Sequence, residues 1–172
     1  MNTQIIYAGK YGSTRRYAEK FSDITGFPVT ASLSSVRNAD RVILFGALYA
    51  GVMLGLKQTA VQCRPEQQLI LVSVGMTDTR CEKLVEGLKK GVEDQLPSHW
   101  KGKCPMFHLM GAFDKSVLNL KDKAMVSVLQ LIDRHLPEQK KTEEMKMMFD
   151  CFSSVSDHVD EKALDPILEA LK

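Results

Sequence analysis

The sequence lacks the features that would mark a membrane or secreted protein. No apolar run reaches the roughly 18 residues that a membrane-spanning helix needs, so we expect no integral membrane segment. The first residues, Met1-Asn2-Thr3-Gln4, contain neither the basic region nor the cleavage site of a secretory signal. We therefore expect a cytoplasmic protein.

Cysteine is scarce and scattered. No CxxC pair and no metal-site spacing occur among the four cysteines, Cys63, Cys81, Cys104 and Cys151. We expect reduced structural thiols and no metal. No histidine lies at a recognisable catalytic spacing from a Cys, Ser or Asp, so the sequence gives no support for nucleophilic catalysis. Catalytic residues remain unassigned.

A charge excess of one sign is also lacking. The chain has 23 Lys and Arg against 21 Asp and Glu, a net charge of +2. This balance argues against nucleic acid as the default partner. Internal repeats, low-complexity tracts and Gly/Ser linkers are absent as well. What is left is a single domain of 172 residues, 44% of them hydrophobic, which is enough to bury a sizeable core.

The chain alternates short apolar runs with longer amphipathic stretches. The apolar runs predict strands at 4–8, 28–31, 41–46, 69–75 and 104–111. The amphipathic stretches predict helices at 13–25, 54–62, 79–95, 118–136 and 158–171. The third and fourth strands are almost continuously apolar, which is typical of central strands in a parallel sheet covered on both faces. The series predicts a doubly wound α/β fold that binds its ligand at the carboxyl ends of the strands.

The first turn at that edge reads Gly9-Lys10-Tyr11-Gly12-Ser13-Thr14. It leaves a strand and enters a helix, so its backbone N–H groups lie at the positive end of that helix and suit an anion. Lys10 adds a positive charge, and Ser13 and Thr14 add hydroxyl donors. The turn is neither a GxxxxGK[ST] loop nor a GxGxxG fingerprint. Phosphate binding and a simple helix cap therefore both remain open.

Two further turns follow the central strands. Ala47-Leu48-Tyr49-Ala50-Gly51 sets small residues around one aromatic, which suits a flat ligand that stacks on the ring. A flexible turn with an incidental tyrosine is the alternative. Gly75-Met76-Thr77-Asp78 would form the adjacent wall of the same cleft, although Asp78 or Thr79 could simply cap the next helix.

The second half of the chain offers weaker signals. We interpret His108, inside the fifth predicted strand, as a hydrogen-bonded or surface histidine rather than a proton relay. The segment after Gly111, which carries Asp114 and Asp122 among lysines, is interpreted as a solvated helix start, with a docking rim for a partner or substrate as the alternative. The methionines and phenylalanines of 145–152 are typical of helix packing, with a partner surface as the alternative.

The run from Ile5 to Thr14 resembles the phosphate-loop segment of flavodoxin-domain proteins. Leu48–Gly51 resembles their second flavin loop, and the turn at Gly75 fits their third. The resemblance covers roughly residues 4–136 and points to the bacterial branch similar to menaquinone-dependent protoporphyrinogen dehydrogenase. It implies a flavodoxin-like three-layer sandwich whose five-stranded parallel sheet has the order 2-1-3-4-5. We expect a single domain over 1–172, with 137–172 as a C-terminal helical portion.

The resemblance also implies one noncovalently bound FMN. By position, the phosphate would be wrapped by the turn of Gly9, Lys10, Tyr11, Gly12, Ser13 and Thr14. The isoalloxazine would be flanked by Ala47, Leu48, Tyr49, Ala50 and Gly51, with Tyr49 as the contacting aromatic. Its pyrimidine side would meet Gly75, Met76, Thr77 and Asp78. The family usually has a hydroxyl residue in place of Gly9, and often Ser, Thr or Asp in place of Tyr11, so this chain has fewer hydroxyl donors there.

We therefore expect an FMN-binding, flavodoxin-like redox protein, an oxidoreductase acting on a small organic substrate, with protoporphyrinogen suggested by the resemblance. One alternative is a flavodoxin-type electron carrier that serves a redox protein partner without small-molecule turnover. The near-neutral charge counts against it, because such carriers dock through a surface of one sign. The other alternative is a flavin-free binding domain, favoured by Gly9 and Tyr11. A homo-oligomer is compatible with the sequence.

Overall fold

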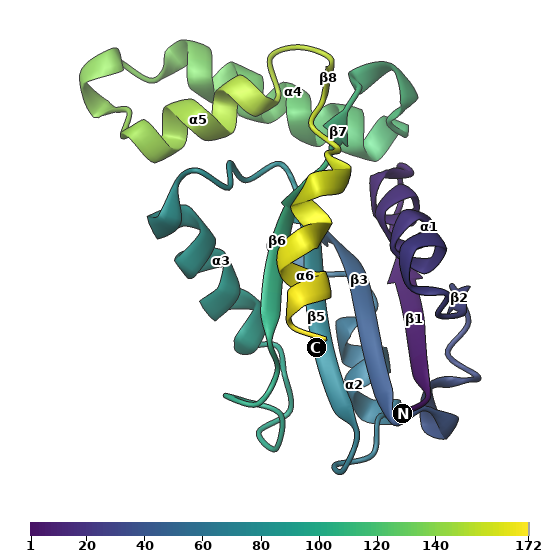
Figure 1. The fold of residues 1–172 in the computed structure, drawn as a ribbon. Coiled ribbons are helices and arrows are strands. Elements are labelled where there is room, and N and C mark those ends of the chain that lie inside the picture. The colour runs from purple at the N-terminus through teal and green to yellow at the C-terminus, as the bar shows by residue number, and fades with distance from the viewer. Residues whose placement is uncertain (172) are drawn as a thin grey trace.

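In the computed structural model, which describes residues 1–171, a parallel β-sheet forms the centre of the molecule (Figure 1). Its strands are β1 (Thr3–Ala8), β2 (Val29–Thr30), β3 (Arg41–Tyr49), β5 (Gln68–Gly75) and β6 (Met106–Met110). They lie in the order β2-β1-β3-β5-β6. β4 (Val52–Met53) is a short antiparallel strand at the end of β3, so this is the order 2-1-3-4-5 of the five predicted strands. The predicted fold class is confirmed.

Helices cover both faces of the sheet because successive strand residues point to opposite sides. Ile5 and Ile43 pack on the face covered by α1 (Ser13–Thr25) and α6 (Asp165–Glu169). Their neighbours Ile6 and Leu44 pack on the face covered by α2 (Leu56–Gln62) and α3 (Glu82–Glu93). These four side chains are at most 1% exposed, so water is excluded from both faces of the sheet at these positions. The result is a three-layer sandwich.

Several predicted boundaries need correction. The third strand does not end at Gly46 but runs to Tyr49, because the chain folds back there into β4. The helix predicted over 79–95 begins only at Glu82. The helix predicted over 158–171 is wrong in its first part, since a 3-10 helix, η4 (Glu161–Leu164), precedes α6, with Pro166 in the first turn of α6. Lys172, the end of the predicted portion 137–172, lies outside the described residues.

Residues 114–155 form a helical cap over the carboxyl ends of the strands (Figure 1). The cap contains η2 (Lys115–Val117), α4 (Leu120–His135), η3 (Glu138–Lys140) and α5 (Glu143–Cys151). Helix α4 lies within the helix predicted over 118–136, and α5 lies within the predicted C-terminal helical portion, where the sequence predicts no separate helix before residue 158. The chain enters the cap through β7 (Ala112–Phe113) and leaves it through β8 (Ser156–Asp157), and these two short strands pair antiparallel. A further 3-10 helix, η1 (Val36–Asn38), leads into β3.

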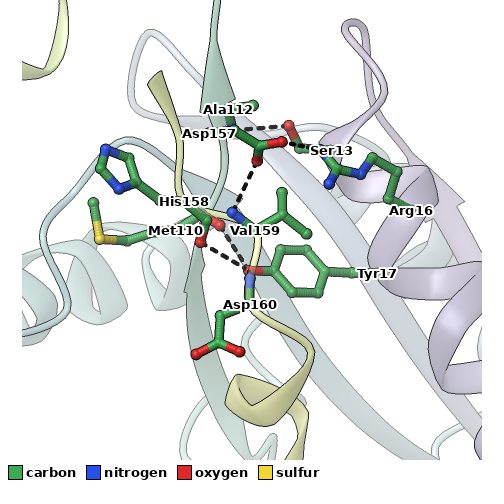
Figure 2. Close-up of polar contacts among 9 residues, drawn as sticks. All are labelled: Ser13, Arg16, Tyr17, Met110, Ala112, Asp157, His158, Val159 and Asp160. Carbon is green, nitrogen blue, oxygen red and sulfur yellow. Dashed lines mark hydrogen bonds and ion pairs between the residues drawn. The ribbon is translucent and has the colours of Figure 1, made fainter.

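The two segments that join the cap to the rest of the molecule, residues 110–113 and 156–160, form its stem, which is fixed to α1 (Figure 2). The Tyr17 hydroxyl donates to the Met110 carbonyl at 2.8 Å and accepts from the Asp160 N–H at 2.9 Å. Arg16 pairs with Asp157 of β8 at 2.8 Å. Helix α1 therefore holds the chain both where it leaves the sheet and where it returns.

Candidate functional site

A cavity of about 180 Å³ lies at the carboxyl ends of the strands, under the cap. Its floor comes from the first turn, the β3–β4 hairpin and the end of β5, and its roof comes from the cap and stem. The roof is apolar, being lined by Phe113, Leu118, Met125, Val126 and Phe152. Phe113 and Phe152 meet edge to face at 5.1 Å. The cavity is where a doubly wound fold holds its ligand.

The first turn joins β1 to α1 and places the N-terminus of α1 beside the cavity. Gly12 has a φ of 98°, which lets the chain turn into α1 at Ser13. The first turn of α1 holds no acidic residue and no side chain caps it, so its N–H groups face the cavity end uncompensated. The Ser13 hydroxyl oxygen accepts from the Ala112 N–H at 2.9 Å, which leaves its hydrogen free to donate.

Gly9 has no room for a side chain. A Cβ there would lie 2.9 Å from the Thr14 side chain, which is itself buried. The absence of a hydroxyl residue at this position is therefore imposed by Thr14. Gly9 supports the turn without lining the cavity.

The second loop is an ordered hairpin turn rather than a flexible one. Tyr49 pairs with Val52 across β3 and β4, and the two residues between them have φ angles of 50° at Ala50 and 79° at Gly51. Positive φ at both positions is the pattern of a type I′ turn. Gln95 secures the turn by donating to the Gly51 carbonyl at 2.9 Å. The hairpin thus presents Tyr49 to the cavity in a fixed place.

The third loop, residues 75–78 at the end of β5, is held by hydrogen bonds from two sides. The Nε2 of His108 lies 3.1 Å from the Thr77 carbonyl, and its Nδ1 lies 3.0 Å from the Ser73 hydroxyl. Burial lowers the pKa of His108 below its ordinary value, so the ring is neutral. His108 is a hydrogen-bonded core histidine, as predicted. From the cap, the Cys151 thiol donates to the Met76 carbonyl at 3.0 Å.

Asp78 and Thr79 do not cap the next helix, so that alternative is wrong. Asp78 instead accepts from the Arg80 N–H at 2.9 Å and pairs with the Arg80 guanidinium at 2.6 Å. The hydrogen bonds from Arg80 lower the pKa of Asp78. This local turn delays the start of α3 to Glu82 and leaves Asp78 away from the cavity.

The structure brings ten of the predicted site residues together around the cavity. They are Lys10, Tyr11, Ser13, Thr14, Ala47, Leu48, Tyr49, Ala50, Gly75 and Met76. Five others support the loops without lining the cavity, namely Gly9, Gly12, Gly51, Thr77 and Asp78. The three turns thus converge because the strand order places their strands side by side.

Asp122 lines the cavity although it is not among the predicted site residues. It belongs to the first turn of α4, which was interpreted as solvated, yet it is only 2% exposed. Its carboxylate accepts from the Tyr11 and Tyr49 hydroxyls and from Lys10 at 3.3 Å. These hydrogen bonds, led by that from Tyr11, lower the pKa of Asp122 and keep it ionised at neutral pH. Lys10 also lies 3.7 Å from the centre of the Tyr49 ring.

Asp122 is buried because α4 lies across the sheet edge and turns its first turn inward. A sequence signal did exist. Asp122, Met125 and Val126 share one face of α4, so the carboxylate lies at the start of an apolar stripe. A charge in such a stripe indicates a buried partner.

Within residues 1–171 no helix is long and apolar enough to cross a membrane. The same part of the chain holds no group of three or more His, Cys, Asp or Glu side chains placed to bind a metal ion.

A family model described as a flavodoxin domain matches residues 4–140. The comparison with curated proteins finds no match. Among solved structures, the Trp repressor binding protein from Bacillus subtilis is similar, with 16% identity and a TM-score of 0.41. That similarity covers 63% of this chain and 82% of the other. With the family model matching most of its length, the chain belongs to the flavodoxin-domain family.

Proposed function

We propose that the protein binds FMN noncovalently in the cavity under the cap and works as an oxidoreductase on a small organic substrate. The observation that carries this proposal is the convergence, in a flavodoxin-family fold, of an anion-binding turn with apolar and aromatic walls. Domains of this family generally bind flavin.

The polar end of the cavity fits a phosphate. The N–H groups at the start of α1, the free hydrogen of the Ser13 hydroxyl and the Lys10 ammonium supply donors and positive charge. Phosphate oxygens take such donors readily, and a helix N-terminus favours their charge. Lys10 to Thr14 are the residues that would hold the phosphate.

The rest of the cavity fits a flat aromatic ring system. Ala47 to Ala50 lie on one side, where Tyr49 offers a ring for contact, and Gly75 and Met76 lie at the end of β5. A Cβ on Gly75 would come within 3.1 Å of Leu48, so small size is needed there. Bound flavin would supply hydride and electron transfer, and the chain would orient it and exclude water.

The apolar roof favours a small organic substrate over a protein partner. Phe113, Met125 and Phe152 offer apolar contact to a molecule that enters the cavity, whereas a protein would meet the outside of the cap. Among residues 1–171, the titratable side chains lining the cavity are Lys10, Tyr11, Tyr49 and Asp122, and we assign none of them as catalytic acid or base. The resemblance to the protoporphyrinogen dehydrogenase branch makes porphyrinogens and quinones the first molecules to test.

The decisive experiment is the visible spectrum of the purified protein before and after incubation with FMN and desalting. We expect a retained flavin spectrum, with FMN released on denaturation. A colourless protein that takes up no FMN would contradict the proposal. Reduction of the bound flavin by a porphyrinogen, followed by reoxidation by a quinone, would support the oxidoreductase. Reduction by a flavodoxin reductase, with no turnover of small molecules, would indicate an electron carrier.

Ser13→Ala tests the phosphate site. Loss of a hydrogen bond to a charged group costs about 1.5–3 kcal/mol, so we expect FMN affinity to fall at least about tenfold. Riboflavin, which lacks the phosphate, should bind the variant and the natural chain equally. Ser22→Ala is the matched control, because Ser22 lies on the same helix and donates to Phe27 instead. Fluorescence titration of the three proteins with the two flavins measures all six affinities.

A further inference from the structure

The helical cap is attached to all three loops of the site. Asp122 of α4 contacts Lys10 and Tyr11 of the first turn and Tyr49 of the hairpin. Cys151 of α5 contacts Met76 of the third loop. The stem is held separately by α1 (Figure 2). The cap is thus fixed at its stem and fastened at its far side mainly through one carboxylate.

That carboxylate depends on groups outside its own helix. Asp122 is 2% exposed and lies in the apolar stripe of α4, where an unpaired charge would be costly. Asn119 of the preceding turn contributes one hydrogen bond at 3.3 Å. The other donors, Lys10, Tyr11 and Tyr49, come from the two turns opposite. Asp122 therefore stabilises the closed position of the cap.

The closed cavity is too small for a nucleotide-sized ligand. Its volume is about 180 Å³, whereas pockets that bury such ligands measure about 300–1,000 Å³. The floor belongs to the buried sheet and its tight turns, so the roof is the part that can yield. A ligand of that size gains room in the cavity when the cap moves away from the turns.

Two of the donors that hold Asp122, Lys10 and Tyr11, are also ones that an incoming phosphate would take. Carboxylate and phosphate oxygens accept from the same ammonium and hydroxyl groups. Two anions at Lys10 would repel each other across a short distance. One of them must leave when the other binds.

We propose that Asp122 is a latch that holds the cap closed through Lys10, Tyr11 and Tyr49, and that the phosphate of the ligand opens it by displacing the carboxylate from Lys10 and Tyr11. The proposal rests on the proposed function for the identity of the phosphate. It makes Asp122 a positioning residue: the cap must release its carboxylate before either flavin enters, and its charge opposes only the phosphorylated one.

The first test compares Asp122→Asn with the natural chain by fluorescence titration with FMN and with riboflavin. Removing the charge loosens the cap for both flavins but relieves repulsion only for FMN. We expect the ratio of FMN to riboflavin affinity to rise about tenfold. Asp133→Asn, on the same helix but paired with Lys141, should leave the ratio unchanged. An unchanged or lower ratio in Asp122→Asn would overturn the latch.

The second test needs no flavin. Amide hydrogen exchange over residues 120–126 should be at least about tenfold faster in Asp122→Asn than in the natural chain, with the strands β3 and β5 unaffected. Tyr11→Phe removes one donor to the carboxylate without changing a charge, and should act in the same direction. Equal exchange in all three proteins would overturn the latch. If no protein binds either flavin, the proposed function fails, and this exchange comparison alone decides the latch.

Discussion

At some positions of this protein, a neighbouring backbone segment lies so close that only glycine fits. Gly46 lies in the middle of β3, where a Cβ would come within 2.7 Å of the Leu54 carbonyl oxygen and of the Met53 side chain. The carbonyl is backbone and has little freedom to shift. The short strand β4 can therefore fold back on β3 only because position 46 has no side chain.

Gly46→Ala should lower the free energy of unfolding by about 1–3 kcal/mol, the range for overpacking a filled site. Gly87→Ala is the matched control, since Gly87 is a helical residue of α3 with nothing within 4 Å of its Cβ position. That change should raise stability by about 0.5–1 kcal/mol through helix propensity. Urea unfolding measures both. If Gly46→Ala leaves the free energy of unfolding unchanged, the hairpin shifts freely to make room for the methyl group.

His108 should make stability depend on pH. The folded ring has a pKa below 6.5 because of burial, whereas the unfolded ring is protonated near pH 6.5. The unfolded state then binds more protons, so the free energy of unfolding should fall as pH drops below about 6.5, by up to about 1.4 kcal/mol per pH unit. Above pH 6.5 this contribution is complete.

His108→Gln should remove that slope, as measured by urea unfolding between pH 7 and 5. His135→Gln, which changes an exposed imidazole on α4, should retain it. The same slope in both variants would assign the pH dependence to other groups.

At the scale of elements, the stem of the cap depends on one hydroxyl. Tyr17→Phe leaves the Asp160 N–H without its acceptor and the Met110 carbonyl without its donor (Figure 2). Such unsatisfied buried groups cost about 1–3 kcal/mol. We expect that loss of stability, with faster hydrogen exchange over 156–164. Tyr7→Phe, a ring on the same face of the sheet, is the control. Unchanged exchange would mean that the stem is held elsewhere.

The elements show which part of the fold can be predicted from sequence. The apolar runs of β3 and β5 locate the central strands because burial on both faces imposes hydrophobicity at every position. The meeting of the three turns can then be predicted as well, since the carboxyl ends of parallel strands lie at one edge of the sheet. The type I′ turn at Ala50 and Gly51 could not be predicted from the sequence, because alanine rarely adopts a positive φ. The inward face of α4 is indicated by Asp122 in line with Met125 and Val126, but the place of the cap over the sheet is not, because it depends on contacts between distant segments.

At the scale of the whole molecule, the hydrophobic clusters that hold the sheet and the cap differ in size. The two faces of the sheet have extensive buried clusters that span the sheet and its covering helices. The cap has a small one, whose buried residues are Phe113, Leu118 and Val126. A small core with exposed helix faces stabilises its own region weakly.

We therefore expect the cap to open more readily than the sheet unfolds. Amides of α4 and α5 should exchange through openings of lower free energy than amides of β3 and β5, and that free energy should not follow global stability in mild denaturant. Native-state hydrogen exchange measures this. Equal protection of cap and sheet would show that the molecule opens only as one unit.

The pairing of β7 with β8 has a consequence for how proteins of this architecture can diverge. Ala112 faces Asp157 and Phe113 faces Ser156, so the chain leaves the sheet and comes back through adjacent positions. Neighbours across an antiparallel ladder are about 5 Å apart, a gap that a short turn can close. The segment between them can be lengthened, shortened or exchanged while the strands and turns beneath the cavity stay in place. The roof over the site can thus change in length without moving the strands beneath it, as long as a residue in the place of Asp122 still meets Lys10, Tyr11 and Tyr49.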